Sequence, residues 1–325
     1  MNNKIISAVL VCFAMISTAT MAQSSRPGNP RDYEQDVLLE VFKLTQADSD
    51  VPFDSLMQAC PARDCIPSID EPVFIPAHEV EYLREDDLVL TLTHHGVTRS
   101  YPTRILDHHE IVNDMFGPDP VAITYCPLCG SGLAFDRRQN GQVLDFGVSA
   151  LLHNSDLVMY DRQTESLWQQ ITGQAFAGKS RGSQLRALPL SMVTWGEWRQ
   201  KYPDSEVLTV DGVQTDRYQK DAYADYAENE RLYMPVSSTD ARLHPKRVIY
   251  GIEVGEHALA VDAKYLAGEG SWSKEYEGQK LLLSLQAGGE VEASLDGKPI
   301  TIHRMYWFAW YTFHPNTALI DGKAQ

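Results

Sequence analysis

The 325-residue chain has little of what defines several protein classes. Basic residues are scarce, with 28 lysines and arginines against 44 acidic residues, and the resulting net charge of −16 disfavours nucleic acid and anionic membrane surfaces as partners. After the first residues, no apolar run approaches the ~20 residues that span a membrane. No nucleotide cofactor is expected. The remaining composition, 43% hydrophobic and 22% charged, is that of a globular protein, and its length is typical of about two domains.

Cysteine is also scarce, with five in the chain, and the first of them lies in an export signal. Residues 1–22 combine Lys4, an apolar stretch over 5–16 and a small-residue exit at Ala22, which is the pattern of a signal peptide. We therefore expect a soluble periplasmic or secreted protein with no transmembrane segment in the mature chain. Cys12 leaves with the signal.

Export decides how the other four cysteines are interpreted, because thiols outside the cytoplasm oxidise unless something protects them. Cys60 and Cys65 lie in a proline-flanked loop with no histidine nearby. This pattern predicts a structural disulfide. The second pair, Cys126 and Cys129, needs a separate explanation.

The rest of the chain predicts an α+β, mainly β fold made of two related units. An amphipathic helix is expected over 32–47, within an N-terminal region 23–72 that also holds the disulfide loop. Trp195, Trp198 and Pro203 recur in their spacing as Trp307, Trp310 and Pro315, which indicates an internal duplication. We assign the units to 73–212 and 235–325, joined by a bridge over 213–234. The first unit is enlarged by a segment that contains the second cysteine pair.

Short β-branched runs broken by turn residues predict hairpins over 88–101, 133–148 and 157–168. The second turns at Asn140-Gly141, the strongest short hairpin signal that a sequence offers.

The Cys-Pro-Leu-Cys-Gly motif at 126–130 follows an apolar run and allows three interpretations. A thioredoxin-like site needs a helix N-terminus to lower the pKa of its first cysteine, and a hairpin is expected here instead. In a metal knuckle, two thiolates at this spacing bind one soft ion, and copper is favoured over zinc or iron. The third interpretation is a short, reducible disulfide.

A knuckle supplies only two ligands, so the others must come from elsewhere. Polar residues crowd the segment 101–114, where we expect a short helix with His109 and Asn113 on one face and Glu110 beside them. A helix capped and paired at the surface is the alternative. Met159 is a further candidate ligand, or else a core residue on its strand.

Taken together, the motifs resemble the bacterial domain of unknown function 3179 family. The likeness covers about residues 65 to 320 and rests on five ordered segments, 101–106, 109–114, 124–130, 154–162 and 168–173. It implies an exported or membrane-associated bacterial protein and brings no activity with it. It also implies that His109, and not His108, is the family histidine, and that the pair Cys60 and Cys65 is an addition to the usual loop.

The leading hypothesis is an exported metalloprotein that binds copper or another soft ion through Cys126, Cys129 and His109, with Met159 as a further ligand. Redox chemistry on a small substrate could follow, with that molecule or a metal donor as the partner. The candidate catalytic residues are Cys126, Cys129, His109, Glu110, Arg104, Asn113 and Asp156. The alternatives are a thiol-disulfide oxidoreductase that cycles the cysteine pair, and a non-catalytic binding module with a structural disulfide.

Overall fold

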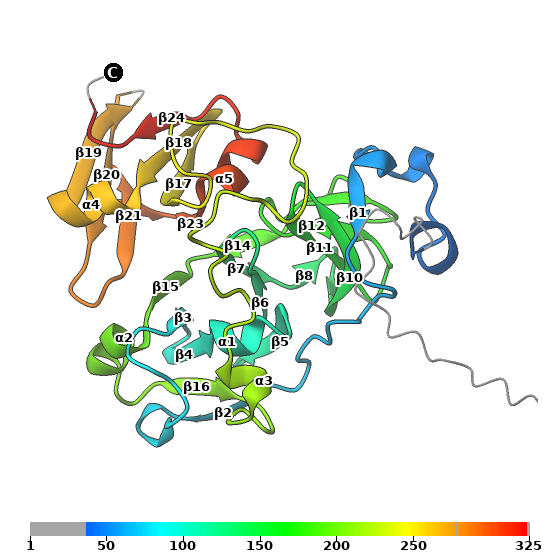
Figure 1. Ribbon diagram of the computed structural model, residues 1–325, viewed down its shortest axis with the longest axis horizontal. Helices are drawn as coiled ribbons and strands as arrows, with labels where there is room; N and C mark the ends of the chain where they lie inside the picture. Colours follow the sequence, from blue (N-terminus) through cyan, green and yellow to red (C-terminus); the bar gives the residue numbers. More distant parts are fainter. Residues whose placement is uncertain (1–36, 277, 324–325) are drawn as a thin grey trace, which may run out of the picture.

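The computed structural model describes residues 37–276 and 278–323, and it is mainly β, as predicted (Figure 1). The predicted signal peptide, residues 1–22, lies outside the described residues. Five sheets of four or five strands account for most of the regular structure. None of the described helices is long and apolar enough to cross a membrane.

Three of the sheets belong to the first two-thirds of the chain. One has the order β1 (Leu56–Gln58), β10 (Phe146–His153), β11 (Asp156–Asp161), β12 (Leu167–Gln169), β13 (Ala175–Ala177). The second has the order β14 (Arg186–Leu188), β7 (Ser131–Asp136), β6 (Asp119–Cys126), β5 (Ile111–Phe116). The third has the order β15 (Ser191–Thr194), β3 (Leu88–His94), β4 (Val97–Pro102), β16 (Glu206–Thr209), β2 (Val73–Pro76).

The remaining sheets lie mostly in the last third of the chain. One has the order β23 (His303–Tyr306), β17 (Val248–Val254), β18 (His257–Asp262), β24 (Ala318–Ile320). Another has the order β19 (Ser271–Tyr276), β20 (Gln279–Leu285), β21 (Val291–Leu295), β22 (Lys298–Ile300), and a two-stranded ribbon pairs β8 (Arg138–Gln139) with β9 (Gln142–Val143). The helices are short: α1 (Thr103–Leu106), α2 (Trp195–Lys201), α3 (Asp216–Gln219), α4 (Ala263–Glu269) and α5 (Trp307–Phe313).

The hairpins predicted over 88–101 and 157–168 form, whereas of the hairpin predicted over 133–148 only the central ribbon of β8 and β9 forms, since β7 and β10 belong to different sheets. Asn140 and Gly141 take φ of 50° and 79° between β8 and β9, as an Asn-Gly hairpin turn requires. β3 pairs with β4, and β11 pairs with β12, over the other two predicted segments. The predicted helix over 32–47 is wrong in its described part, where a helical turn covers only Val37–Val41 and a second turn covers Gln46–Asp48.

Two sheets have the same construction. In each, a hairpin (β3–β4 or β17–β18) pairs antiparallel with one strand (β15 or β23) and parallel with another (β16 or β24). A seven-residue helix, α2 or α5, connects those two outer strands. In both helices the indole of the second tryptophan donates to a hydroxyl seven residues later, from Trp198 to Ser205 at 3.1 Å and from Trp310 to Thr317 at 2.9 Å.

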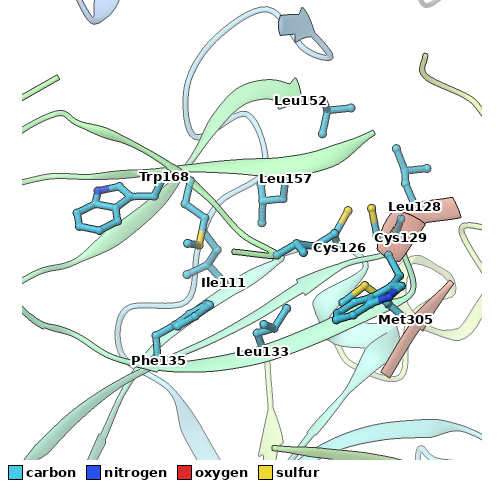
Figure 2. Close-up of a cluster of buried hydrophobic side chains, with 14 of the residues drawn as sticks. Ile111, Cys126, Leu128, Cys129, Leu133, Phe135, Leu152, Leu157, Trp168 and Met305 are labelled. Atoms are coloured by element: carbon cyan, nitrogen blue, oxygen red, sulfur yellow. The ribbon is translucent and has the colours of Figure 1, made fainter. Parts of the chain in front are cut away.

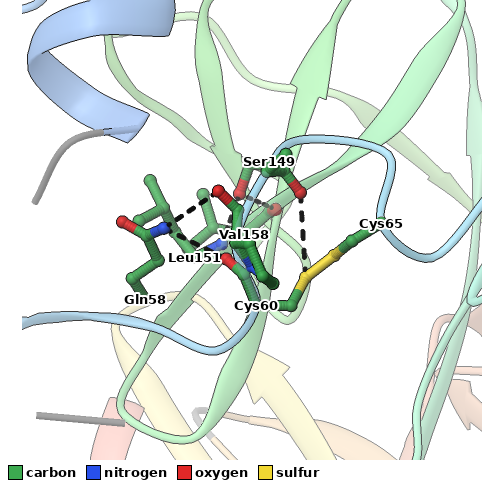
Figure 3. The surroundings of a disulfide bond; sticks show 8 residues. Gln58, Cys60, Cys65, Ser149, Leu151 and Val158 are labelled. Carbon is green, nitrogen blue, oxygen red and sulfur yellow. Dashed lines mark hydrogen bonds between the residues drawn. A yellow bond between two sulfur atoms is a disulfide. The ribbon is translucent and has the colours of Figure 1, made fainter. Parts of the chain in front are cut away.

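Cys60 and Cys65 form the predicted disulfide (Figure 3). Its loop packs against the first sheet, since the Asp64 amide donates to the carbonyl of Val148 at 2.8 Å. Gln58 holds the start of the same loop by donating to the Cys60 carbonyl at 3.1 Å. The first cysteine pair is therefore structural.

The main hydrophobic core lies between the sheets of β6 and β11 and includes residues of α5 and β23 (Figure 2). Leu133, Phe135, Leu157 and Trp168 are buried there, and so are Cys126 and Cys129. The second cysteine pair therefore sits inside the core and not on the surface.

Candidate metal centre

The second cysteine pair, Cys126 and Cys129, occupies the turn between β6 and β7. The Cys129 amide donates to the Cys126 carbonyl at 3.2 Å, and Gly130 takes a φ of 56° that lets the chain reverse into β7. Both cysteines are free thiols, with 1% and 0% of their surface exposed. Figure 2 shows the two sulfur atoms side by side.

The turn between β10 and β11 supplies an oxygen to the cysteine pair. Asn154 and Ser155 both take left-handed backbone conformations, with φ of 55° and 64°, which is the conformation of a tight two-residue hairpin loop. This turn directs the Ser155 carbonyl at the thiols, and the two Sγ atoms lie 3.7 Å (Cys126) and 3.4 Å (Cys129) from that oxygen. Left-handed non-glycine residues cost free energy, so the packing around the turn must hold them in place.

Asp156 completes a compact cluster. One carboxylate oxygen and the sulfurs of Cys126 and Cys129 all lie within 4.8 Å of one another, and all three side chains are buried. Oδ2 of Asp156 accepts hydrogen bonds from the Gln169 amide at 2.6 Å and from the backbone of Ile171 at 3.0 Å. Among the described residues, its Oδ1 has no hydrogen-bond partner although it is fully buried. We call Cys126, Cys129 and Asp156 the thiol–carboxyl cluster.

Burial controls protonation in this cluster. It raises the pKa of the Asp156 carboxyl to about 7 against hydrogen bonds from Gln169 and Ile171 that favour the charged form. It also raises the pKa of the Cys126 thiol, and that of Cys129 well above its usual range, and the nearby Asp156 charge acts in the same direction. The strongest influences on the two thiols are burial, the neighbouring thiol and the carboxyl group of Asp156, so the cluster gathers acidic groups.

Two further carboxyl groups lie close to the cluster. Glu110 is buried, and burial together with the charges of Asp156 and Asp107 raises its pKa to about 8. Burial and the charge of Asp221 raise the pKa of Asp107 to about 7, against the opposing effect of Arg104. The site thus concentrates groups that would lose a proton if a cation were bound nearby.

A long irregular segment, residues 220–247, covers this region, and we call it the strap. In Figure 1 it runs from α3 at the bottom of the view to β17 at the top. The Met234 carbonyl accepts from Ser155 Oγ at 2.7 Å, which ties the strap to the turn above the thiols. The buried Lys246 ammonium holds the strap together by donating to the carbonyls of Asn229 at 2.6 Å and Arg231 at 2.7 Å.

A pocket of about 340 Å³ lies between the strap, α1 and the cysteine turn. Pro127 of the turn lines it together with five tyrosines, Tyr125, Tyr218, Tyr223, Tyr226 and Tyr306. The backbone of Tyr306 donates to the Cys129 carbonyl at 2.9 Å, so this wall of the pocket is attached directly to the turn. A small molecule in the pocket would therefore lie next to the enclosed thiols.

Two of the residues predicted around the cysteines, His109 and Arg104, have other partners. The His109 ring bonds to the Pro67 carbonyl at 2.8 Å and to the Tyr218 hydroxyl at 2.9 Å, and it is not among the residues of the thiol–carboxyl cluster. Burial lowers its pKa. Arg104 pairs with Asp87 and faces the pocket.

The helical spacing predicted for His109 and Asn113 is wrong. Helix α1 ends at Leu106, Glu110 takes a left-handed φ of 56°, and Asn113 belongs to strand β5. The Asn113 side chain bridges to the backbone of Phe146, donating at 2.8 Å and accepting at 2.9 Å. This residue therefore joins β5 to β10.

Met159 lies on β11, fully buried, opposite Val148 and Trp168 on the neighbouring strands. It belongs to the same core cluster as the cysteine pair. Its role as a ligand stays a prediction from the sequence.

The sequence predicts Asp156 as a catalytic residue and not as a ligand, whereas the structure places its carboxyl group with the two thiols. The Asn-Ser-Asp run at 154–156 carried the signal, because Asn followed by a small polar residue between two apolar strands favours a tight turn. Ser155 contacts the two sulfur atoms through its backbone carbonyl, which every residue type has, so the sequence could not indicate this contact.

The fold and the site together define a mainly β protein with an enclosed pair of free thiols beside a buried carboxyl group. The chain belongs to the family described as protein of unknown function (DUF3179), which matches residues 63–297 and confirms the predicted resemblance. Cys65 lies within this range and Cys60 outside it. No curated protein and no solved structure matches the chain.

Proposed function

We propose that this protein is an exported metalloprotein that binds one soft metal ion at the thiol–carboxyl cluster. The observation that carries the proposal is the buried Oδ1 of Asp156, which has no hydrogen-bond partner among the described residues and belongs to a carboxyl group next to two free thiols. A buried polar atom without a partner costs free energy, and a cation bound between the two thiols would supply the missing partner of this oxygen.

The dimensions of the cluster support this assignment. Ligands about 2.3 Å (sulfur) and about 2.1 Å (oxygen) from a tetrahedral ion lie about 3.6 to 3.8 Å from one another. The three ligand atoms are already within 4.8 Å, so contraction by about an ångström brings them to that spacing. The Ser155 carbonyl oxygen lies close to both sulfur atoms and could serve as the fourth ligand.

Copper remains our preferred ion, because two thiolates suit the soft Cu(I) ion, and Oδ1 of Asp156 would be its third ligand. Zinc is the competitor, since two thiolates and a carboxylate balance a doubly charged ion better. His109 and Met159 would act only if the site rearranged on loading.

The oxidoreductase alternative receives less support. A thiol that attacks a disulfide must be exposed and ionised, whereas Cys126 is 1% exposed and burial raises its pKa. Carboxyl groups surround it where a catalytic thiol needs a cation or a helix N-terminus.

The tyrosine-lined pocket is our candidate for the place where a small substrate or a metal donor approaches the ion. Export through the signal peptide at 1–22 fits the Cys60–Cys65 disulfide, which forms in oxidising compartments. We also propose that the sheets that contain β3 and β17 descend from an internal duplication, on the strength of their shared strand order and Trp–hydroxyl bonds.

The test is metal analysis of the protein purified from the periplasm, beside Cys126→Ser and the control Cys60→Ser with Cys65→Ser. We expect about one ion per chain in the wild type and in the control, and less than a tenth of that in Cys126→Ser. Equal, negligible metal in all three proteins, also after reconstitution with Cu(I) or Zn²⁺, contradicts the proposal. Insulin-reductase activity that depends on Cys129 would instead support the oxidoreductase.

A further inference from the structure

A second group of potential ligands lies far from the cysteine pair, at the end of the β3–β4 hairpin. Nε2 of His94 lies 2.8 Å from Oδ2 of Asp119, and Nε2 of His95 lies 2.5 Å from the same oxygen. The three ligand atoms lie within 4.8 Å of one another. The side chains of His94 and Asp119 are 23% and 17% exposed, and that of His95 is 55% exposed, so solvent reaches the group.

The turn that carries His95 is unusual in its residue choice. His95 and Gly96 form the two-residue loop between β3 and β4, with φ of 48° and 77°. The first position of such a loop favours Asn, Asp or Gly, and another residue there costs free energy. Despite this cost, the chain has a histidine at this position, and its ring lies against Asp119. The ring centroids of His94 and His95 are 4.6 Å apart.

We propose that His94, His95 and Asp119 form a second metal site, which takes a borderline divalent ion such as Zn²⁺ or Cu²⁺. Imidazole and carboxylate suit these ions, whereas the thiol pair suits a softer one. The proposal goes beyond the function proposed above and does not depend on it. Along β6, Asp119 and Cys126 are seven residues apart, about 23 Å at ~3.3 Å per residue, so the two sites cannot share an ion.

The geometry needs only a small adjustment. Ligand atoms about 2.1 Å from a tetrahedral ion lie about 3.4 Å apart, so each imidazole must withdraw from the carboxylate by less than about 1 Å. The exposed His95 ring has room to do so. In the loaded site each imidazole would carry its proton on Nδ1 and offer the lone pair of Nε2, and a water molecule would take the fourth position.

The surroundings set the strength of the site. Oδ1 of Asp119 pairs with Arg138, which keeps the pKa of this carboxyl below its usual range and leaves it ionised. Arg138 also contacts Asp136 at 3.4 Å, so its charge is shared between two carboxylates. The Phe116 ring packs against His94 and limits its movement. The end of β3 thus carries an imidazole whose position is restricted, and the start of β6 carries an ionised carboxylate. His95, in the turn between β3 and β4, supplies the third ligand.

The test is Zn²⁺ binding measured by calorimetry with the full mature chain, in a Cys126→Ser, Cys129→Ser background that removes the first site. The decisive variant is His95→Asn, because asparagine favours the same turn and the hairpin should stay folded. His78→Asn, which removes another exposed imidazole, is the matched control.

We expect one Zn²⁺ per chain in the background protein and in the control, and binding at least about 100-fold weaker in His95→Asn. Equal binding with and without His95 overturns the proposal. If the serine background does not fold, anomalous scattering at the zinc edge from Zn²⁺-soaked wild-type crystals decides. A peak between His94, His95 and Asp119 supports the site, and its absence at millimolar Zn²⁺ refutes it, whatever happens at the cysteine pair.

Discussion

Replacing Asp156 with asparagine should make the metal-free protein more stable and the metal site weaker. The wild-type carboxyl is fully buried, and its pKa rises from 3.8 to about 7. A carboxyl whose folded pKa is raised destabilises the folded state once the pH exceeds its unfolded pKa, because the folded protein must bury the charge. The penalty is small near pH 4, grows until about pH 7, and is constant above that.

The magnitude follows from the shift. About three pKa units at 1.36 kcal/mol each give a penalty of about 4 kcal/mol above pH 7. At pH 5 the same linkage gives between about 1 and 2 kcal/mol, so the advantage of Asp156→Asn should grow by about 2 to 3 kcal/mol between pH 5 and pH 8. The asparagine oxygen can still accept from Gln169 and Ile171. Since a ligand is lost, affinity for Zn²⁺ should fall at least about tenfold.

The assay is urea unfolding of the chelator-treated protein at pH 5 and pH 8, with Zn²⁺ affinity measured in parallel. Asp161→Asn is the matched control, at the other end of β11, where the carboxylate accepts from Trp168 at 2.9 Å and from Thr164. That variant should lose stability at both pH values and keep its metal affinity. Our reasoning is refuted if Asp156→Asn gains no stability at pH 8 relative to pH 5, or if it binds Zn²⁺ as tightly as the wild type.

Three other results are expected. Burial keeps both thiols of the cysteine pair protonated at neutral pH, so an ion must displace two protons when it binds. Its affinity, measured by competition with a chelator, should therefore rise about 100-fold per pH unit between pH 7 and 8. An affinity that does not change with pH would exclude the thiols as ligands. Gly130→Ala should cost about 2–4 kcal/mol in urea unfolding, since its new Cβ would lie 2.9 Å from the Tyr306 ring at a left-handed φ. Gly141→Ala, at a left-handed φ in open space, should cost only about 1 kcal/mol, and equal costs would contradict the contact. Replacing Cys60 and Cys65 with alanine should remove about 2 kcal/mol, the value for a six-residue loop, and leave metal content unchanged; loss of metal would show that the loop supports the site.

Local chemistry explains which parts of the fold the sequence predicted. The hairpin at Asn140-Gly141 needs only two residues of suitable backbone preference, and the Cys60–Cys65 disulfide needs only a short loop. Neither depends on distant parts of the chain. Both were therefore predictable from short stretches.

The candidate site was predicted only in part, because its members come together through tertiary packing. The Ser155 carbonyl meets the thiols across a separation of 29 residues from Cys126, and no local pattern encodes that approach. The expected helix near Asn113 failed for a similar reason. Pairing of β5 with β6 outweighed the helical spacing of the polar residues, and the left-handed Glu110 marks the change of direction.

The strap has a consequence for how quickly an ion bound at the thiol–carboxyl cluster could exchange. Ser155 bonds to Met234, and Lys246 holds the strap together at Asn229 and Arg231, so the strap covers the Ser155 turn beside the thiols. An ion that leaves past this turn would have to wait for the strap to open, which is a local unfolding event. On that side, residues 220–247 would slow release in addition to the bonds to sulfur, whereas the tyrosine-lined pocket would stay available to a donor or acceptor of the ion.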